Sequence, residues 1–135
     1  MDEKVPITAS EALTEGIRVR VQARYSAPHS DPEKGRWFFL YTIQVSNEGS
    51  DALTLRSRHW IISDGTGRIE EVRGEGVVGE QPEIQPGHTF EYTSGCPLPT
   101  PFGSMEGNYE MVRGDGSIFR ARIAAFELSL PHALH

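Results

Sequence analysis

Ile17-Arg18-Val19-Arg20-Val21-Gln22-Ala23-Arg24-Tyr25 is the stretch that decides the fold class. Its apolar and polar side chains alternate strictly, which is the period of a β-strand with one face in a core and the other in water. Residues 37–45 alternate in the same way but begin with apolar side chains on both faces. We therefore expect residues 37–45 to form a central strand of a sheet.

Turn-forming residues divide the rest of the chain into short apolar segments. Of its 135 residues, 14 are glycine and 9 are proline, and they are spread along the chain. The stretches Asn47-Glu48-Gly49, Gln85-Pro86-Gly87 and Arg113-Gly114-Asp115-Gly116 predict turns. Further strands are expected at 53–55, 59–62, 69–72, 89–94, 105–111 and 118–130, the last kinked near Ala124-Ala125. The pattern is typical of a β-sandwich or barrel, and about seven or eight antiparallel strands in two facing sheets would satisfy it, so we expect an all-β sandwich.

The first residues of the chain lack this pattern. Residues 10–15 could begin a helix capped by Ser10, but Leu13 has no apolar partner at helical spacing. We expect residues 1–15 to form a flexible N-terminal extension and residues 16–135 to form one domain. No apolar run has the length of a signal peptide or a membrane helix, which favours a cytoplasmic protein without membrane insertion.

Charge and cysteine content exclude several classes of function. Lys and Arg number 13 against 19 Asp and Glu, a formal net charge of −6. This balance disfavours an electrostatic grip on nucleic acid or anionic lipid. Cys96 is the single cysteine, so neither an intrachain disulfide nor a cysteine-based zinc site can form.

A glycine-rich stretch, Gly74-Glu75-Gly76-Val77-Val78-Gly79, fits the pattern G-x-G-x-x-G. In a dinucleotide-binding fold such glycines let the backbone approach a pyrophosphate at the N-terminus of a helix. Here Pro82 and Pro86 follow, which prevents that helix. Two interpretations remain: a loop that crosses between sheets, or a loop that binds an anion or a peptide through its backbone N–H groups. Arginines precede the loop at Arg56, Arg58, Arg68 and Arg73.

No catalytic or metal-binding constellation is recognisable. The pattern G-x-S-x-G is absent, and neighbouring Glu70 and Glu71 would point to opposite faces of a strand. His132 and His135 have a spacing that could bind metal on a helix, but Pro131 disfavours that helix. We expect no enzymatic activity, no cofactor and no metal.

Several segments in order resemble the ApaG family over nearly the whole chain. They are Trp60-Ile61-Ile62-Ser63-Asp64-Gly65, Glu71 to Pro82 including the glycine motif, Ile84-Gln85-Pro86-Gly87, Phe90-Glu91-Tyr92-Thr93-Ser94-Gly95 and Gly107-Asn108-Tyr109-Glu110-Met111. The resemblance implies an immunoglobulin/fibronectin type III-like β-sandwich and an association with cobalt resistance and magnesium efflux. It also implies a protein-interaction role, since related domains are appended to eukaryotic F-box proteins.

The favoured hypothesis is a non-enzymatic binding module that engages an unidentified protein partner beside the glycine loop. Its role in cobalt resistance and magnesium efflux would then be indirect. The alternative is binding of a small anion, such as a nucleotide or pyrophosphate, at residues 74–79. The candidate ligand-binding residues are Trp60, Arg73, Gly74, Glu75, Gly76 and Gly79.

Overall fold

The computed structural model describes residues 7–130, which form nine strands and two single-turn 3₁₀ helices. The strands are β1 (Thr8–Thr14), β2 (Ile17–Tyr25), β3 (Trp37–Asn47), β4 (Leu53–Asp64), β5 (Ile69–Glu75), β6 (Glu83–Ile84), β7 (Thr89–Leu98), β8 (Phe102–Arg113) and β9 (Ile118–Ser129). The 3₁₀ helices are η1 (Ala27–His29) and η2 (Pro32–Lys34). Neither of these two helices, which are the helices of residues 7–130, has the length and apolar character of a membrane-spanning helix.

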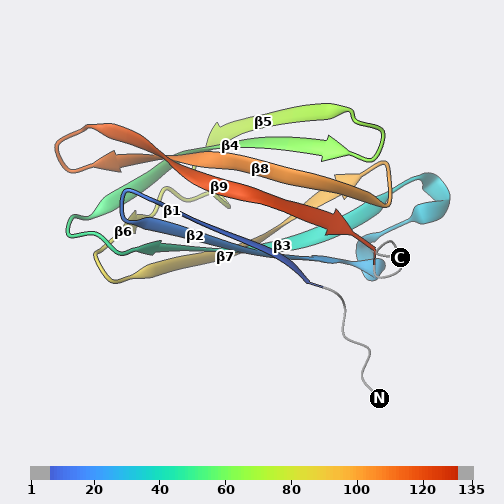
Figure 1. The fold of residues 1–135 in the computed structure, drawn as a ribbon, viewed down its shortest axis with the longest axis horizontal. Helices are drawn as coiled ribbons and strands as arrows, with labels where there is room; N and C mark the ends of the chain where they lie inside the picture. Colours follow the sequence, from blue (N-terminus) through green and yellow to red (C-terminus); the bar gives the residue numbers. More distant parts are fainter. Residues whose placement is uncertain (1–6, 131–135) are drawn as a thin grey trace, which may run out of the picture.

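The strands form two antiparallel sheets that pack face to face (Figure 1). One sheet has the order β1-β2-β3-β7, and the other has the order β5-β4-β8-β9 with the short β6 also paired to β4. This arrangement confirms the predicted all-β sandwich. It also confirms that β3 lies inside its sheet, between β2 and β7.

The core lies between the sheets and follows the alternation seen in the sequence. Ile17, Val19 and Val21 of β2 are each at most 1% exposed, while the arginines between them face outward. Trp60 of β4 is 3% exposed and meets Tyr41 of β3 edge to face, with 5.4 Å between the ring centroids. Aromatic contacts of this kind hold the two sheets in one register against each other.

Two β-bulges interrupt this alternation. The register of β4 against β8 shifts between Leu55 and Ser57, so that Arg56 is an extra residue. Residues 53–55 and 59–62, expected as separate strands, are therefore parts of one bent strand. A second shift places one extra residue on β9 between Ile123 and Phe126, which confirms the kink predicted near Ala124-Ala125.

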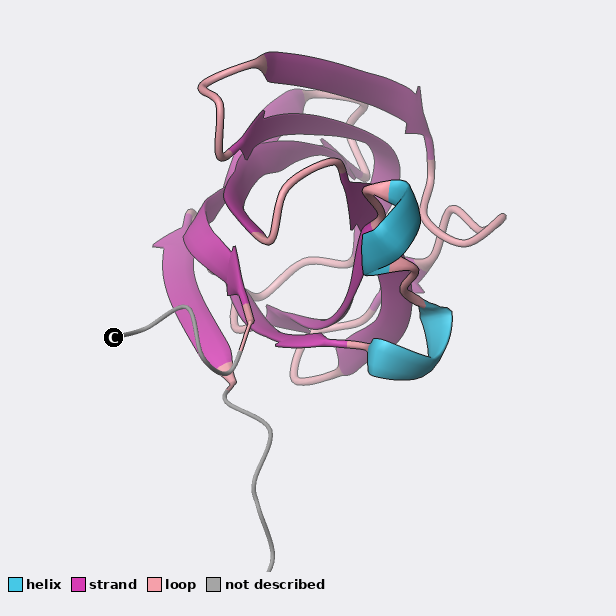
Figure 2. Ribbon diagram, turned by 90° about the vertical axis from the view of Figure 1, so that its right-hand side faces the viewer, coloured by secondary structure: helices cyan, strands magenta, loops and turns pink. Residues whose placement is uncertain are grey.

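The segment Thr8–Thr14 differs from the sequence-based expectation. The sequence predicts a flexible extension over residues 1–15, but Thr8–Thr14 forms strand β1 and pairs with β2 in continuous register. Its inward hydroxyls also reach β9 of the other sheet: Ser10 Oγ donates to the carbonyl of Ala124 at 2.7 Å, and Thr14 Oγ1 accepts from the N–H of Arg122 at 3.1 Å. These bonds join the sheets along one side, and Figure 2 shows the sheets curving around the core.

Candidate functional site

Strand β5 is the exposed edge of its sheet, on the side away from β9 (Figure 1). In the described part of the chain it pairs with β4 alone. Five of its 7 residues are exposed, and only Val72 and Gly74 are partly covered. One edge and the outward face of β5 are therefore open to solvent, whereas Val72 on the inner face packs against the core.

The backbone groups on the free edge can be assigned from the hydrogen bonds at the two ends of β5. The N–H of Asp64 donates to the carbonyl of Arg68 at 3.0 Å, and the N–H of Gly76 donates to the carbonyl of Arg56 at 2.7 Å. Both bonds fit the register of β4 against β5, in which the numbers of two paired residues always add up to the same value. Because hydrogen-bonding direction alternates along a strand, even-numbered residues of β5 face β4. The residues whose N–H and C=O groups face the free edge are Ile69, Glu71, Arg73 and Glu75.

The chain leaves β5 through a tight hairpin. Val77 and Glu80 exchange backbone hydrogen bonds of 2.8 and 2.9 Å. Between them Val78 has φ 43° and Gly79 has φ 80°, the two positive values of a type I′ turn. Glycine adopts such a φ without cost, whereas a β-branched residue such as Val78 does so rarely. Val78 is also 51% exposed. The tip of the loop therefore carries an exposed apolar side chain on a residue with an unfavourable φ.

Arg58 of β4 fixes the start of this loop. Its Nη1 donates to the carbonyls of Glu75 at 3.0 Å and of Gly76 at 2.8 Å. The guanidinium passes directly over Gly74, where a Cβ atom would lie 2.7 Å from Nη2. Gly74 is therefore the residue that lets Arg58 reach the loop carbonyls.

Gly76 has a different structural reason. A Cβ atom there would lie 2.1 Å from the carbonyl oxygen of Glu80, a backbone atom that cannot move aside cheaply. Its φ of 62° adds to the requirement for glycine. Gln81 Nε2 also donates to the carbonyl of Arg56 at 2.8 Å, so the loop folds back over the β-bulge of β4. Each glycine of the motif thus has a role in building this loop.

This geometry gives the anion-binding alternative little support. The N–H groups of Gly76, Val77 and Glu80 already donate to acceptors within the protein. Nη1 of Arg58 is bound to two carbonyls, and the carboxylates of Glu75 and Glu80 flank the turn. A phosphate-binding loop presents free N–H groups to its ligand. Here a negatively charged ligand would instead meet the two carboxylates.

Opposite charges alternate along the outward face of β5. Glu71 accepts a hydrogen bond from His59 of β4 at 2.8 Å and lies 3.5 Å from Nη2 of Arg73. The hydrogen bond with His59, together with the charge of Arg73, lowers the pKa of Glu71 below its usual value. The Arg73 side chain is 73% exposed, so its charge is available to a partner.

We call β5 and the loop that follows it, residues 69–80, together with Arg58 of β4, the β5 strip. Five of the six predicted site residues lie on this strip. Arg73, Gly74 and Glu75 end β5, and Gly76 and Gly79 belong to the loop that follows. Trp60 is the sixth, and the structure does not bring it to the surface. It pairs with Val72 across the β4–β5 ladder but points into the core, since inward residues of β4 pack between the sheets.

Three further residues belong to the strip but were not among the six predicted site residues, although the sequence analysis noted Arg58 as one of the arginines before the loop. They are Arg58, Glu71 and Val78. Arg58 points inward because the β-bulge at Arg56 shifts the alternation of β4 by one residue. Strict alternation from Leu53 and Leu55 would place the polar residue 58 on the outward face. Only the β-bulge shows that it lies on the inward face.

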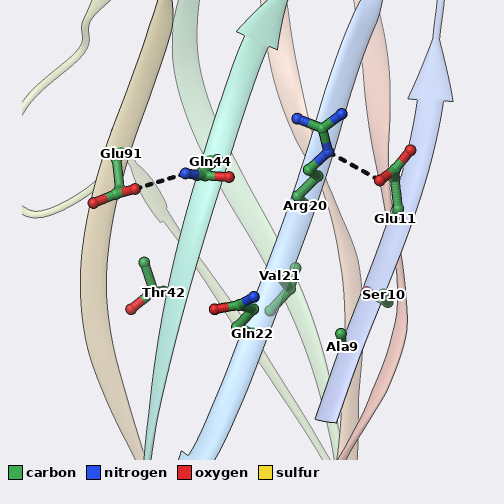
Figure 3. A pocket seen from close by; sticks show the side chains of 9 residues that line it. All are labelled: Ala9, Ser10, Glu11, Arg20, Val21, Gln22, Thr42, Gln44 and Glu91. Atoms are coloured by element: carbon green, nitrogen blue, oxygen red, sulfur yellow. Dashed lines mark hydrogen bonds and ion pairs between the residues drawn. The ribbon is translucent and has the colours of Figure 1, made fainter. Parts of the chain in front are cut away.

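Two other features bear on binding: the grouping of potential metal ligands and a hollow on the opposite sheet. Within residues 7–130 no three His, Cys, Asp or Glu side chains are grouped to hold a metal ion, and His132 and His135 lie outside the described residues. A shallow hollow crosses the outer face of the sheet β1-β2-β3-β7 (Figure 3). Its polar groups pair with each other: Gln44 with Glu91 at 2.8 Å and Arg20 with Glu11 at 2.9 Å. This hollow therefore presents mutually satisfied groups.

Comparisons with known proteins agree on one family. The model of the ApaG domain, DUF525, matches residues 27–113. Protein ApaG of Methylobacterium sp. (strain 4-46) is 54% identical over 122 residues, which cover 90% of this chain and 94% of that protein. Protein ApaG of Rhodospirillum centenum is 52% identical over 120 residues, covering 89% and 92%.

Solved structures show the same similarity. A crystal structure assigned as the ApaA protein from Bordetella pertussis superposes with a TM-score of 0.83 at 51% identity, covering 86% of this chain and 94% of that one. A second X-ray structure, from a structural-genomics consortium, gives a TM-score of 0.85 at 48% identity, covering 92% and 94%.

Proposed function

The chain belongs to the ApaG-domain family, and from that premise we propose that it is a non-enzymatic binding module whose ligand is an extended protein segment. The free edge of β5 carries this proposal. Strand addition needs a row of available N–H and C=O groups, and Ile69, Glu71 and Arg73 present such a row. The segment would add to β5 as a further strand of the sheet.

The surroundings of the edge support a built binding surface. Arg58 and the type I′ turn hold the loop after β5 in one position, so the end of the edge is defined before a partner arrives. Preorganisation of this kind lowers the entropic cost of binding. The exposed side chain of Val78 would supply an apolar contact next to the added strand.

The wider role follows from the family resemblance. We propose that the module acts indirectly in cobalt resistance and magnesium efflux, in the cytoplasm, through a protein partner and without a cofactor or bound metal of its own. A calorimetric titration of metal-free protein with cobalt and magnesium tests this. Absence of saturable heat is the expected result, and stoichiometric binding would contradict an indirect role.

A proline can block the edge while sparing the hydrogen bonds between β5 and β4. The N–H of Glu71 faces away from β4, so Glu71→Pro removes a donor that β5 does not use internally. Glu71→Ala removes the same side chain but keeps that donor. In a crosslinking pull-down from cell extract, we expect Glu71→Ala to retain the proteins captured by the wild type and Glu71→Pro to lose them. Equal capture by both variants would contradict strand addition at β5.

A further inference from the structure

We infer that the free edge of β5 is built to pair with β5 of a second copy of this chain, antiparallel and centred on Val72. The inference rests on the proposed strand addition and names one partner for it. It predicts a symmetric dimer in which two sheets become one continuous sheet through β5. The two copies would use the same seven residues, as a two-fold contact requires.

The outward side chains favour this register. With Val72 opposite Val72 of the second copy, Glu71 faces Arg73 of that copy, and Arg73 faces its Glu71. Both are odd-numbered residues, whose N–H and C=O groups already face the free edge. Each of these pairs would therefore combine two backbone hydrogen bonds with one pair of opposite charges.

The inward side chains agree with the same register. Glu70 is exposed on the inner face and falls opposite Gly74 of the second copy. Gly74 is where the guanidinium of Arg58 passes, with Nη2 2.7 Å from the Cβ position. The carboxylate of Glu70 would thus approach Arg58 of the second copy. The symmetry repeats this pair, which gives four cross-copy charge pairs in all, two on each face.

Neighbouring registers place like charges together. Centring the pairing on Glu71 sets that carboxylate opposite itself, and centring it on Arg73 sets the guanidinium opposite itself and Glu71 opposite Glu75. Like charges directly opposite each other destabilise a ladder. Charged edge strands generally resist unspecific pairing. The charges of β5 therefore disfavour pairing with most strands, but they are complementary to β5 of a second copy in the register centred on Val72.

The contact is small, since it joins only one strand of 7 residues to its copy. Interfaces below the usual size for stable complexes are weak and exchange quickly. We therefore expect a dimer that forms between micromolar and millimolar concentration and weakens with salt, because exposed charge pairs are screened.

Sedimentation equilibrium with the full-length chain tests the inference. The weight-average mass of the wild type is expected to rise from 15.0 kDa toward twice that value across this concentration range. Glu71→Arg alone and Arg73→Glu alone should each remain monomeric, because each creates like-charge pairs. An equimolar mixture of these two variants should dimerise, since one then supplies two arginines and the other two glutamates.

The controls are the same substitutions away from the edge. Glu106 is an exposed residue of the inner strand β8, and Arg122 is an exposed residue of β9 at the opposite edge of the sheet. The variants Glu106→Arg and Arg122→Glu should therefore dimerise like the wild type. A wild type that stays monomeric throughout would overturn the inference, as would a dimer that survives both single reversals. If the wild type is monomeric while Glu71→Pro still loses its captured proteins, the self-pairing fails and the proposed function stands. If Glu71→Pro also captures normally, both fail.

Discussion

Replacing Gly76 with alanine tests whether the glycine motif serves the fold of the loop. The change introduces a Cβ atom 2.1 Å from the carbonyl oxygen of Glu80, at a residue with φ 62°. The left-handed conformation alone costs a non-glycine residue about 1–2 kcal/mol. Relief of the clash must move the turn, which breaks two hydrogen bonds of Gly76: the one that its N–H donates to the carbonyl of Arg56 and the one that its carbonyl accepts from Arg58.

These losses set the expected magnitude. Net contributions of about 1 kcal/mol for each of two lost hydrogen bonds, added to the conformational cost, give roughly 3–4 kcal/mol for Gly76→Ala. For a chain of this length, that corresponds to a fall in Tm of roughly 10–15 °C. Gly35→Ala is the matched control, because Gly35 has φ 70° but nothing within 4 Å of its Cβ position.

Urea unfolding followed by circular dichroism measures both variants. Gly35→Ala should lose only about 1–2 kcal/mol, the conformational cost alone. A Gly76→Ala protein no less stable than Gly35→Ala would show that the clash with the carbonyl of Glu80 is absent. Gly79→Ala should resemble Gly35→Ala, since Gly79 also has a positive φ and open space around it.

Three further predictions follow from the site. Arg58→Met removes the two bonds to the carbonyls of Glu75 and Gly76 and should destabilise the protein by about 1–3 kcal/mol, with faster amide exchange at Val78 and Gly79 measured by NMR; unchanged exchange would show that Arg58 does not hold the loop. Glu71 has a lowered pKa in the folded state, so it binds fewer protons there than in the unfolded chain; its contribution to stability is present above its ordinary pKa of 4.5 and is lost as the pH falls through its folded value. Urea unfolding of Glu71→Gln should therefore show a smaller loss of stability on acidification than the wild type, and an equal loss would contradict the pairing with His59. Titration with pyrophosphate should give no saturable heat for the wild type or for Arg73→Ala, whereas heat that disappears in Arg73→Ala would favour the anion-binding alternative.

The strands with apolar alternation were predictable from the sequence. The period of β2 and β3 depends on which residues face the core, so it is visible before the partners are known. β1 was missed because its inward positions carry Thr8, Ser10 and Thr14, whose hydroxyls bond to β9 where apolar side chains would have packed. β4 was divided in two because one extra residue at Arg56 reverses its alternation.

The site was predictable in part. Residues 73–79 are consecutive in the sequence, so the predicted site residues among them necessarily lie close together in space. The reason for each glycine was not visible, because it depends on Arg58 and on the carbonyl of Glu80. An aromatic residue such as Trp60 suits a core as well as a groove, and only its partners across the sandwich decide between them.

Residue-specific amide exchange along β5, measured by NMR in dilute and in concentrated solution, tests most directly that this strand has a free edge reserved for another strand. In dilute solution we expect slow exchange at Glu70, Val72 and Gly74, which donate toward β4, and fast exchange at Glu71 and Arg73. Raising the concentration should slow Glu71 and Arg73 as the second strand docks. Equal protection of all five amides in dilute solution would contradict a free edge on β5, because the edge would already be covered.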